Sequence, residues 1–439
     1  MEKILSFIEK RLLPPISVLA ELKHLRAIRD GIVAVLPLII LGSFFILLGM
    51  LPVELFTKEF FASHPAIEKA VSWYLENRSW MLLPSRVTIN LMAFFASFGI
   101  ACSLAKSYKL DEISAGMISA AGFLITQIPL NLANIAHGMN NSWVLPMQNL
   151  GGKGLFAAII ISFFTVEVMR FFSRSRMNFK MPEGVPPSVV NAFASLLPGA
   201  VVMLAIWVIA DILKIDFVGA ILYIFKPLVY LGDTIWAVIF INLLMQLIWL
   251  GGIHGASVVN AVFLTVWMGY YEENVAAAQA HQVLPHVTNL VFYQWFVWVG
   301  GSGATLGLVF LLLLSKSKFL KQLGKVAVIP GICNINEPVI FGMPIMMNPI
   351  MALPFISAPI ISGVISYIAI WSGLVSKPFI IVPWTLPAPI GGFLATGYDW
   401  KALVLILVNL IITTAIYYPF VKAYEKQLES KDGTENNSS

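Results

Sequence analysis

The chain has 439 residues, of which 58% are hydrophobic and 12% are charged; its formal net charge is +5 and its mean hydropathy is +0.83. Soluble domains carry about 25% charged residues, so this composition excludes a soluble α/β enzyme, a disordered protein and a disulfide scaffold. It predicts an all-α polytopic membrane protein, and the length leaves room for about ten transmembrane helices.

Basic residues cluster at four places and orient the predicted spans. The clusters lie at 23–29, 170–180 and 316–325 and in the polar tail 421–439. Lys and Arg beside a span mark its cytoplasmic end. We therefore expect cytoplasmic N- and C-termini and an even number of crossings between successive clusters.

The first 180 residues have a regular pattern. Residues 1–30 are interpreted as an amphipathic cytoplasmic segment, followed by apolar runs near 31–51, 87–105, 113–130 and 154–172. The asparagine-rich loop at 131–153 is expected to face outside or to line a cavity. Residues 31–180 are therefore assigned to a transmembrane scaffold.

Glycine and proline interrupt the apolar runs after residue 180. These runs lie near 189–213, 233–250, 256–271, 284–314, 338–356, 358–375, 378–397 and 401–420. Non-helical backbone at membrane depth is tolerated only where it is buried in protein or lines a water-filled cavity, and transporters build substrate sites from such broken helices. Residues 181–420 are therefore assigned to a transport domain and 421–439 to a cytoplasmic tail.

The first break with polar chemistry runs from Trp249 to Ser257. His254 lies there between glycines, and no Asp, Glu, Lys or Arg occurs from Thr234 to Tyr271. A neutral histidine bonded to a backbone carbonyl is one interpretation. A functional histidine is the other, favoured by the paired glycines and by the adjacent Ser257.

The second break, Gly300–Gly303, contains Gly301 and Ser302. Close helix packing explains small residues of this kind well. The alternative is a turn whose backbone groups approach a ligand. The run is not a phosphate loop, because the Lys-Ser/Thr of a Walker turn is missing.

The third break, Pro330–Pro338, carries Glu337, the only charged side chain between Lys325 and Lys377. A carboxylate at membrane depth costs about 2.5–3.5 kcal/mol on insertion scales and usually marks a substrate or ion path. Capping of half-helix amides is the structural alternative. Farther along, Trp384 lies between prolines and is equally compatible with an interface belt and with a sugar-stacking face.

The pairing of Gly252–Gly255 with Asn334–Pro338 resembles the membrane (IIC) component of a bacterial phosphoenolpyruvate-dependent sugar phosphotransferase system, in the lactose/cellobiose/diacetylchitobiose branch. The resemblance extends to His24–Gly31, Pro182–Pro187 and Gly300–Gly303. It implies about ten transmembrane helices with two re-entrant hairpins in the C-terminal half. It also implies a homodimer formed through the N-terminal scaffold, and a moving C-terminal domain that holds the sugar.

The resemblance also implies roles for individual residues. His254 and Glu337 would be catalytic, contacting the hydroxyl that becomes phosphorylated; Trp249 and Trp384 would flank the sugar, and Asn336 would lie beside it. Asn140 or Asn141 would contribute from the first half. We expect Ser257, Gly301 and Ser302 in the same site, because they lie at the same breaks.

These inferences predict a sugar permease in the bacterial inner membrane, in contact with lipid, that binds a β-linked disaccharide. A phosphocysteine on a separate IIB subunit, with IIA upstream, would phosphorylate the 6-hydroxyl. No cofactor, metal or nucleic-acid partner is expected. The rival hypothesis is a proton-coupled sugar symporter that uses Glu337 and His254 without group transfer.

Overall fold

The computed structural model describes residues 22–51, 53, 64–127, 130–131, 143–175, 187–343, 345 and 349–435. Apart from a two-residue antiparallel ladder, β1 (Leu130–Asn131) with β2 (Trp143–Val144), all regular structure in this part of the chain is helical. Within these described ranges, six helical segments are long and apolar enough to cross a membrane: Lys23–Gly49, Pro65–Ser107, Gly152–Arg174, Val189–Ile212, Ile350–Trp371 and Trp400–Leu428. The prediction of an all-helical membrane protein is confirmed.

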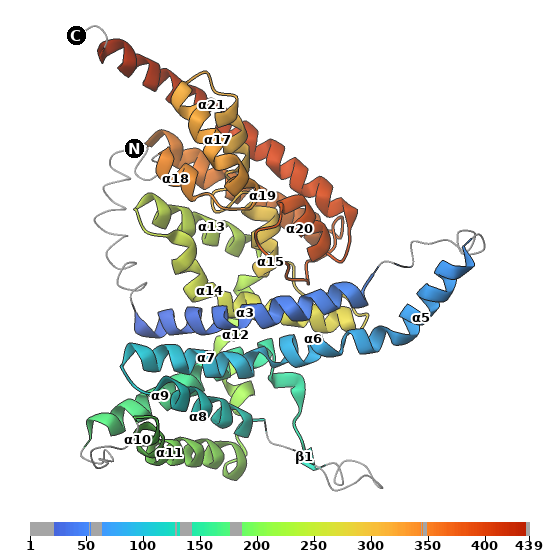
Figure 1. Cartoon of the computed structure of the whole chain (residues 1–439), viewed down its shortest axis with the longest axis vertical. Helices are drawn as coiled ribbons and strands as arrows, with labels where there is room; N and C mark the ends of the chain where they lie inside the picture. Colours follow the sequence, from blue (N-terminus) through green and yellow to red (C-terminus); the bar gives the residue numbers. More distant parts are fainter. Residues whose placement is uncertain are drawn as a thin grey trace.

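The N-terminal half forms one group of helices, in the lower part of Figure 1. Its elements are α3 (Lys23–Gly49), α5 (Pro65–Met81), α6 (Leu83–Thr88), η3 (Ile89–Leu91), α7 (Met92–Ser107), α8 (Glu112–Ile125), η5 (Met147–Asn149), η6 (Gly152–Gly154), α9 (Leu155–Arg174), α10 (Pro187–Ala194), α11 (Leu196–Trp207) and the π-helical turn η7 (Val208–Ile212).

Small residues let these helices approach closely. Gly31 of α3 packs on Gly99 and Ile100 of α7, and a Cβ atom at Gly31 would lie 2.4 Å from the Ile100 nitrogen. Serine hydroxyls add polar contacts, because Ser119 lies 2.8 Å from Ser97 and 3.2 Å from Ser162, all three buried. Small residues and interhelical hydrogen bonds are the usual means of helix association in lipid.

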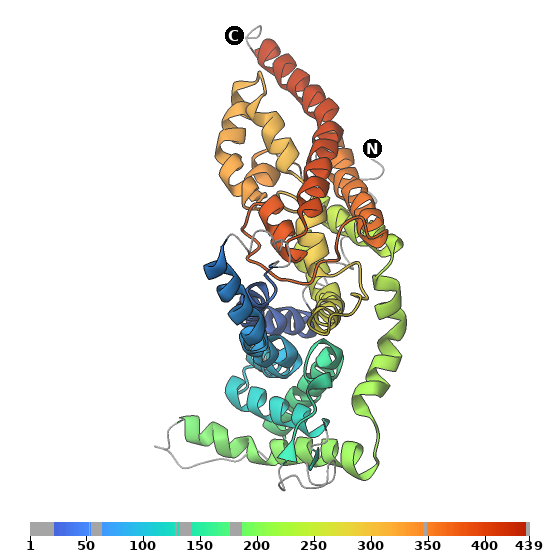
Figure 2. The same ribbon diagram turned by 90° about the vertical axis from the view of Figure 1, so that its right-hand side faces the viewer.

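Most of the C-terminal half forms a second group, in the upper part of Figure 1, whereas α12 (Phe217–Gly232) lies at the level of the first group. The elements of this half are α12, α13 (Ile235–Leu250), α14 (Gly255–Gln279), α15 (Leu290–Phe292), the π-helical turn η8 (Tyr293–Val297), α16 (Leu306–Leu313), α17 (Lys318–Ile332), α18 (Glu337–Gly342), α19 (Pro349–Trp371), α20 (Ala388–Ala395) and α21 (Trp400–Glu435). Figure 2 shows α12 along one side of the molecule, connecting the two groups.

Several predicted runs differ from the helices found. The runs at 338–356 and 358–375 are not two helices: α18 ends at Gly342, and α19 continues through Pro354 and Pro359 to Trp371. Neighbouring helices and local backbone adjustment let membrane helices keep internal prolines. The run at 378–397 is mostly irregular, with only the eight-residue α20 helical.

Side chains from α19 and α21 satisfy the broken backbone near residue 300. The Phe296 carbonyl accepts hydrogen bonds from Asn409 and Ser366, at 2.9 and 3.2 Å. Tyr417 donates to the Gly303 carbonyl at 2.7 Å, and Thr305 donates to the Gly300 carbonyl at the same distance. These bonds explain how a non-helical turn persists in the apolar interior, where an unpaired carbonyl would be costly.

Candidate functional site

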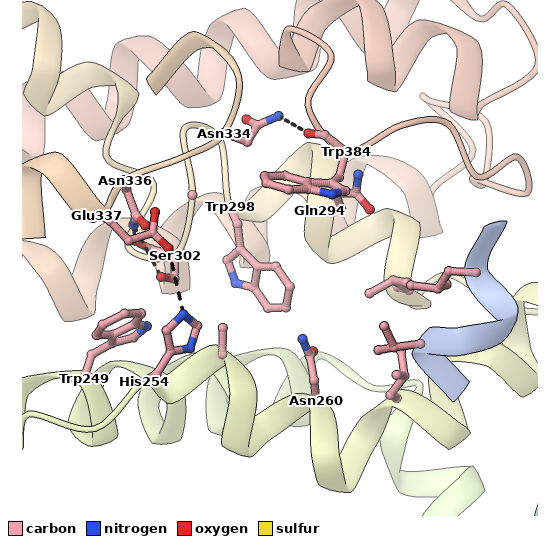
Figure 3. Close-up of a pocket in the computed structure, with 16 residues that line it drawn as sticks. Trp249, His254, Asn260, Gln294, Trp298, Ser302, Asn334, Asn336, Glu337 and Trp384 are labelled. Atoms are coloured by element: carbon pink, nitrogen blue, oxygen red, sulfur yellow. Dashed lines mark hydrogen bonds and ion pairs between the residues drawn. The ribbon is translucent and has the colours of Figure 1, made fainter. Parts of the chain in front are cut away.

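The three broken segments converge on one cavity of about 280 Å³ (Figure 3). It is lined by Val33, Leu36, Trp249, His254, Ala256, Asn260, Leu264, Leu290, Gln294, Trp298, Gly301, Ser302, Asn334, Asn336, Glu337 and Trp384. The floor comes from the start of α14, the roof from the turns before α16 and α18, and one end from α3. The cavity therefore combines aromatic faces with carboxamide, imidazole and carboxylate groups.

His254 is fixed by the start of α14. It is the N-cap residue of that helix, and its Nδ1 accepts a 3.1 Å hydrogen bond from the Ser257 amide. The Ser257 hydroxyl lies 2.9 Å from the same nitrogen. Because Nδ1 acts as an acceptor, the neutral imidazole carries its proton on Nε2.

Glu337 faces this Nε2–H group. The distance from His254 Nε2 to Glu337 Oε1 is 3.9 Å, and both side chains remain about half exposed, at 49% and 47%. Among the described residues no hydrogen bond joins the Glu337 carboxylate to a backbone amide, so the capping alternative gains no support. The pair is open to the cavity and can share a polar group placed between them.

Gly301 allows the second and third breaks to touch. Its φ of +96° belongs to the region that favours glycine, and a Cβ atom there would lie 2.5 Å from Asn336 Cγ. The Asn336 amide donates to the Ser302 carbonyl and lies 3.3 Å from the Ser302 hydroxyl. Asn336 and Ser302 thus line the cavity and also bind each other.

Three tryptophans supply the aromatic walls. The Trp249 ring lies 4.4 Å from the His254 ring. Trp298 donates a 2.8 Å hydrogen bond to Asn242, which orients its indole. Trp384 is 52% exposed and lines the cavity, as Figure 3 shows.

Ser257 does not line the cavity; its amide and hydroxyl contact the His254 ring and hold the imidazole. Asn140, like Asn141, lies outside the residues that the structure describes.

The sequence interpretation did not assign Asn260, Gln294 or Trp298 to the site. Asn260 Oδ1 and Gln294 Nε2 are buried in the cavity wall without a hydrogen-bond partner in the described part of the chain. Each is the only carboxamide in an apolar stretch, residues 255–271 and 290–305. That isolation is the signal that could have identified them, because buried amide groups normally have partners.

A separate ionic cluster joins the turn between α12 and α13 to α14 and to the segment that follows α14. His286 Nδ1 lies 3.1 Å from Asp233, and its Nε2 lies 2.8 Å from Glu273. Burial disfavours the imidazolium, but these two carboxylates raise the pKa of His286 to about 9. Burial likewise opposes ionisation of Asp233, yet hydrogen bonds from His286 and Thr288 lower the pKa of that carboxyl group.

Known proteins resemble the chain over nearly its whole length. Residues 29–359 match the family described as "Phosphotransferase system, EIIC". The cellobiose-specific EIIC component of Geobacillus stearothermophilus is 40% identical, covering 98% of this chain and 96% of the relative. The lichenan permease IIC component of Bacillus subtilis is 38% identical, with 97% and 95% covered.

A solved structure shows the same architecture. The crystal structure of the transporter ChbC, the IIC component from the N,N'-diacetylchitobiose-specific phosphotransferase system, superposes with a TM-score of 0.86. The two chains are 36% identical, and the alignment covers 97% of this chain and 99% of the other. The fold and the sequence therefore point to the same family.

Proposed function

The chain belongs to the EIIC family of the phosphotransferase system, as a multi-pass membrane protein of its cellobiose/lactose/chitobiose branch, and from this premise we propose that it carries a β-linked disaccharide across the bacterial inner membrane for phosphorylation. The disaccharide is of the cellobiose or diacetylchitobiose type. Relatives named for cellobiose and a structure named for diacetylchitobiose support this choice.

The observation that carries the proposal is the His254–Glu337 pair in an aromatic cavity. One group donates and the other accepts at a separation of 3.9 Å, so one sugar hydroxyl can bind both. Trp249, Trp298 and Trp384 offer apolar faces for the C–H side of a sugar ring. A pyranose ring needs this combination, because its hydroxyls bind polar groups while its C–H faces pack on apolar walls.

The far end of the cavity supports a second sugar ring. Asn260 and Gln294 each contribute a carboxamide group to this wall, and Figure 3 places both beyond Trp298, away from Glu337. The carboxamide groups of Asn260 and Gln294 line this end, and carboxamides can exchange hydrogen bonds with the hydroxyls of a second ring. A disaccharide can therefore bind the His254–Glu337 pair with one ring and the Asn260 and Gln294 carboxamides with the other.

We propose that phosphorylation occurs on the ring that binds the His254–Glu337 pair. The 6-hydroxyl oxygen attacks the phosphorus of a phosphocysteine on the IIB component, the P–S bond breaks, and the cysteine leaves as thiolate. Glu337 accepts the hydroxyl proton as general base, and His254 Nε2–H orients the hydroxyl oxygen. The protein is then the membrane component of a protein-phosphocysteine–sugar phosphotransferase.

The partners follow from the family. IIC components work with IIB components, and relatives such as the lactose-specific EIICB component of Staphylococcus haemolyticus, 31% identical, unite both names in one chain. For this chain we propose separate IIB and IIA proteins. A homodimer formed through residues 31–180 is proposed from the family resemblance.

The proposed membrane arrangement has about ten spans and two re-entrant hairpins. One hairpin is α13 with α14, with His254 near its tip, and the other is α17 with α18, with Glu337 at its tip. The amphipathic segment 1–30, the scaffold 31–180, the transport domain 181–420 and the tail 421–439 complete the arrangement. The basic clusters support cytoplasmic N- and C-termini.

Uptake into membrane vesicles that contain the protein tests the proposal. With phosphoenolpyruvate and the soluble phosphotransferase components supplied inside, labelled cellobiose or diacetylchitobiose should accumulate as the sugar phosphate. Uptake should stop without IIB and persist when an uncoupler removes the proton gradient. Accumulation of free sugar that the uncoupler abolishes would establish the symporter instead.

A further inference from the structure

We propose that Asn334 is a positioning residue that holds Trp384 and the Gly300–Gly301 turn together at the wall of the sugar cavity. This inference rests on the proposed function, because it concerns how the same cavity acquires its shape. It assigns Asn334 no contact with the reacting atoms.

The side chain of Asn334 is bonded to two other segments of the chain. Its Oδ1 accepts a 3.0 Å hydrogen bond from the Gly300 amide. Its Nδ2 donates to the carbonyl oxygens of Trp384 and Leu386, each at 2.9 Å. Figure 3 shows this amide directed at the Trp384 main chain. Because both N–H groups of the Asn334 side chain are bonded within the protein, we expect Asn334 to affect sugar binding through the positions of Trp384 and Gly300.

The segment that carries Trp384 has one local backbone hydrogen bond, from the Leu386 amide to the Pro383 carbonyl at 3.0 Å, and no regular helix or strand. Residues 376–383 form neither helix nor strand, and α20 begins only at Ala388. Pro383 and Pro387 have no amide proton, which removes two possible backbone donors. The two bonds from Asn334 therefore set the position of the Trp384 backbone relative to Glu337, which lies three residues beyond Asn334.

The backbone of Asn334 also restricts the residue type. Its φ is +62°, a left-handed conformation that glycine and asparagine adopt more readily than other residues. The same turn is closed by hydrogen bonds from Asn334 N to the Gly331 carbonyl and from Ile335 N to the Pro330 carbonyl, at 3.1 and 2.9 Å. Glycine can therefore replace Asn334 while keeping this turn, which separates the backbone role from the amide role.

Two variants test the amide. Asn334→Gly keeps the left-handed turn and deletes all three side-chain bonds. Asn334→Asp keeps an acceptor for the Gly300 amide but places a carboxylate oxygen against two carbonyls. For each variant we expect the disaccharide Kd and KM to rise about tenfold or more, as expected for the loss of two or more hydrogen bonds. The kcat for phosphorylation should fall less than KM rises, because His254 and Glu337 are retained.

A spectroscopic readout isolates Trp384. In protein labelled with 5-fluorotryptophan, the Trp384 resonance is assigned by its loss in Trp384→Phe. It should shift or broaden in both Asn334 variants without sugar. His281→Gly is the matched control, since His281 also has a left-handed backbone, with φ of 54°, and lies outside the cavity lining; it should leave the resonance and the Kd unchanged.

Wild-type affinity and an unmoved Trp384 resonance in Asn334→Gly would overturn the inference while leaving the proposed function intact. If the glycine variant fails to accumulate in the membrane, the same outcome in Asn334→Asp overturns it. If the wild-type protein binds no disaccharide, the proposed function fails. The fluorine spectrum, which needs no sugar, still decides the role of Asn334.

Discussion

Ser43 of α3 and Tyr271 of α14 share a buried hydrogen bond of 2.9 Å although 228 residues separate them. Two further side-chain bonds join the halves nearby: Tyr398 donates to the Leu47 carbonyl at 2.9 Å, and Gln279 donates to the Ser85 hydroxyl at 3.0 Å. The N-terminal and C-terminal halves are thus held together by polar contacts at the last turns of α3 and at α6. Any sliding of one half past the other must exchange these bonds.

Tyr271→Phe should destabilise the protein modestly. The variant keeps the ring but leaves the buried Ser43 hydroxyl without this partner, at a cost of about 1 kcal/mol. The apparent Tm in detergent should fall by about 1–3 °C. Tyr223→Phe, on a side chain that is 78% exposed, is the control and should not move Tm. Equal Tm values for the two variants would contradict the prediction.

Glu337→Gln should separate sugar binding from phosphorylation. Glutamine retains an oxygen acceptor for the hydroxyl but cannot take its proton, so the disaccharide Kd should stay within a few-fold of the wild-type value. Phosphoryl transfer should slow by roughly 10²–10⁴, the usual contribution of a general base. Calorimetry and single-turnover transfer from phospho-IIB measure the two effects. Loss of binding and transfer by the same factor would remove the catalytic role.

Trp384→Ala should weaken disaccharide binding about tenfold, a loss typical of a buried aromatic contact. The comparison is Trp371→Ala, because Trp371 is also exposed, at 68%, but ends α19 away from the cavity lining. Both affinities are measured on the purified protein. An unchanged Kd in Trp384→Ala would assign Trp384 to the membrane interface.

Asn260→Ala and Gln294→Ala should weaken the binding of a disaccharide more than the binding of a monosaccharide. Each removes a carboxamide that has an unpaired atom at the far end of the cavity. The Kd for a disaccharide should rise roughly three- to tenfold, while binding of the corresponding monosaccharide should change little. If both ligands lose affinity equally, these amides do not contact the second ring.

The His286 cluster should make stability depend on pH in a defined direction. The pKa of His286 is raised from 6.5 to about 9 in the folded protein. Its stabilisation is therefore complete below about pH 6.5 and is lost as pH rises through about 9. Asp233, whose pKa is lowered, contributes above its unfolded pKa and loses its contribution in acid. Tm should decline between pH 7 and 10 in the wild type, and His286→Asn should flatten this decline.

The sequence predicted the chemistry of the breaks better than their tertiary contacts. Glycines around His254 and prolines around Glu337 identify two interruptions, and the structure brings these two residues within 3.9 Å. The pattern could not show which amides face the cavity. Asn334 and Asn336 are equally polar in the sequence, and only the positions of Gly300, Ser302 and Trp384 determine that both bind the protein.

Helix boundaries were harder to predict where charged residues or prolines lie inside a helix. No run was assigned to α5 or α12, because α5 is interrupted by charges and α12 contains Lys226 and Pro227. The prolines in α19 suggested a helix end that neighbouring helices prevent. The Asp233–Glu273–His286 cluster could not be found from spacing, because its members meet only through folding.

Val33 and Leu36 give the cavity one wall that belongs to α3, whereas its polar groups belong to the second half. If the second half moves with its sugar, that wall stays behind. A disaccharide analogue with a bulky apolar group pointing toward α3 would then contact both halves and prevent the second half from moving. It would also resist displacement by further substrate. Such a compound would be a dead-end inhibitor, because it would bind tightly and would not be transported.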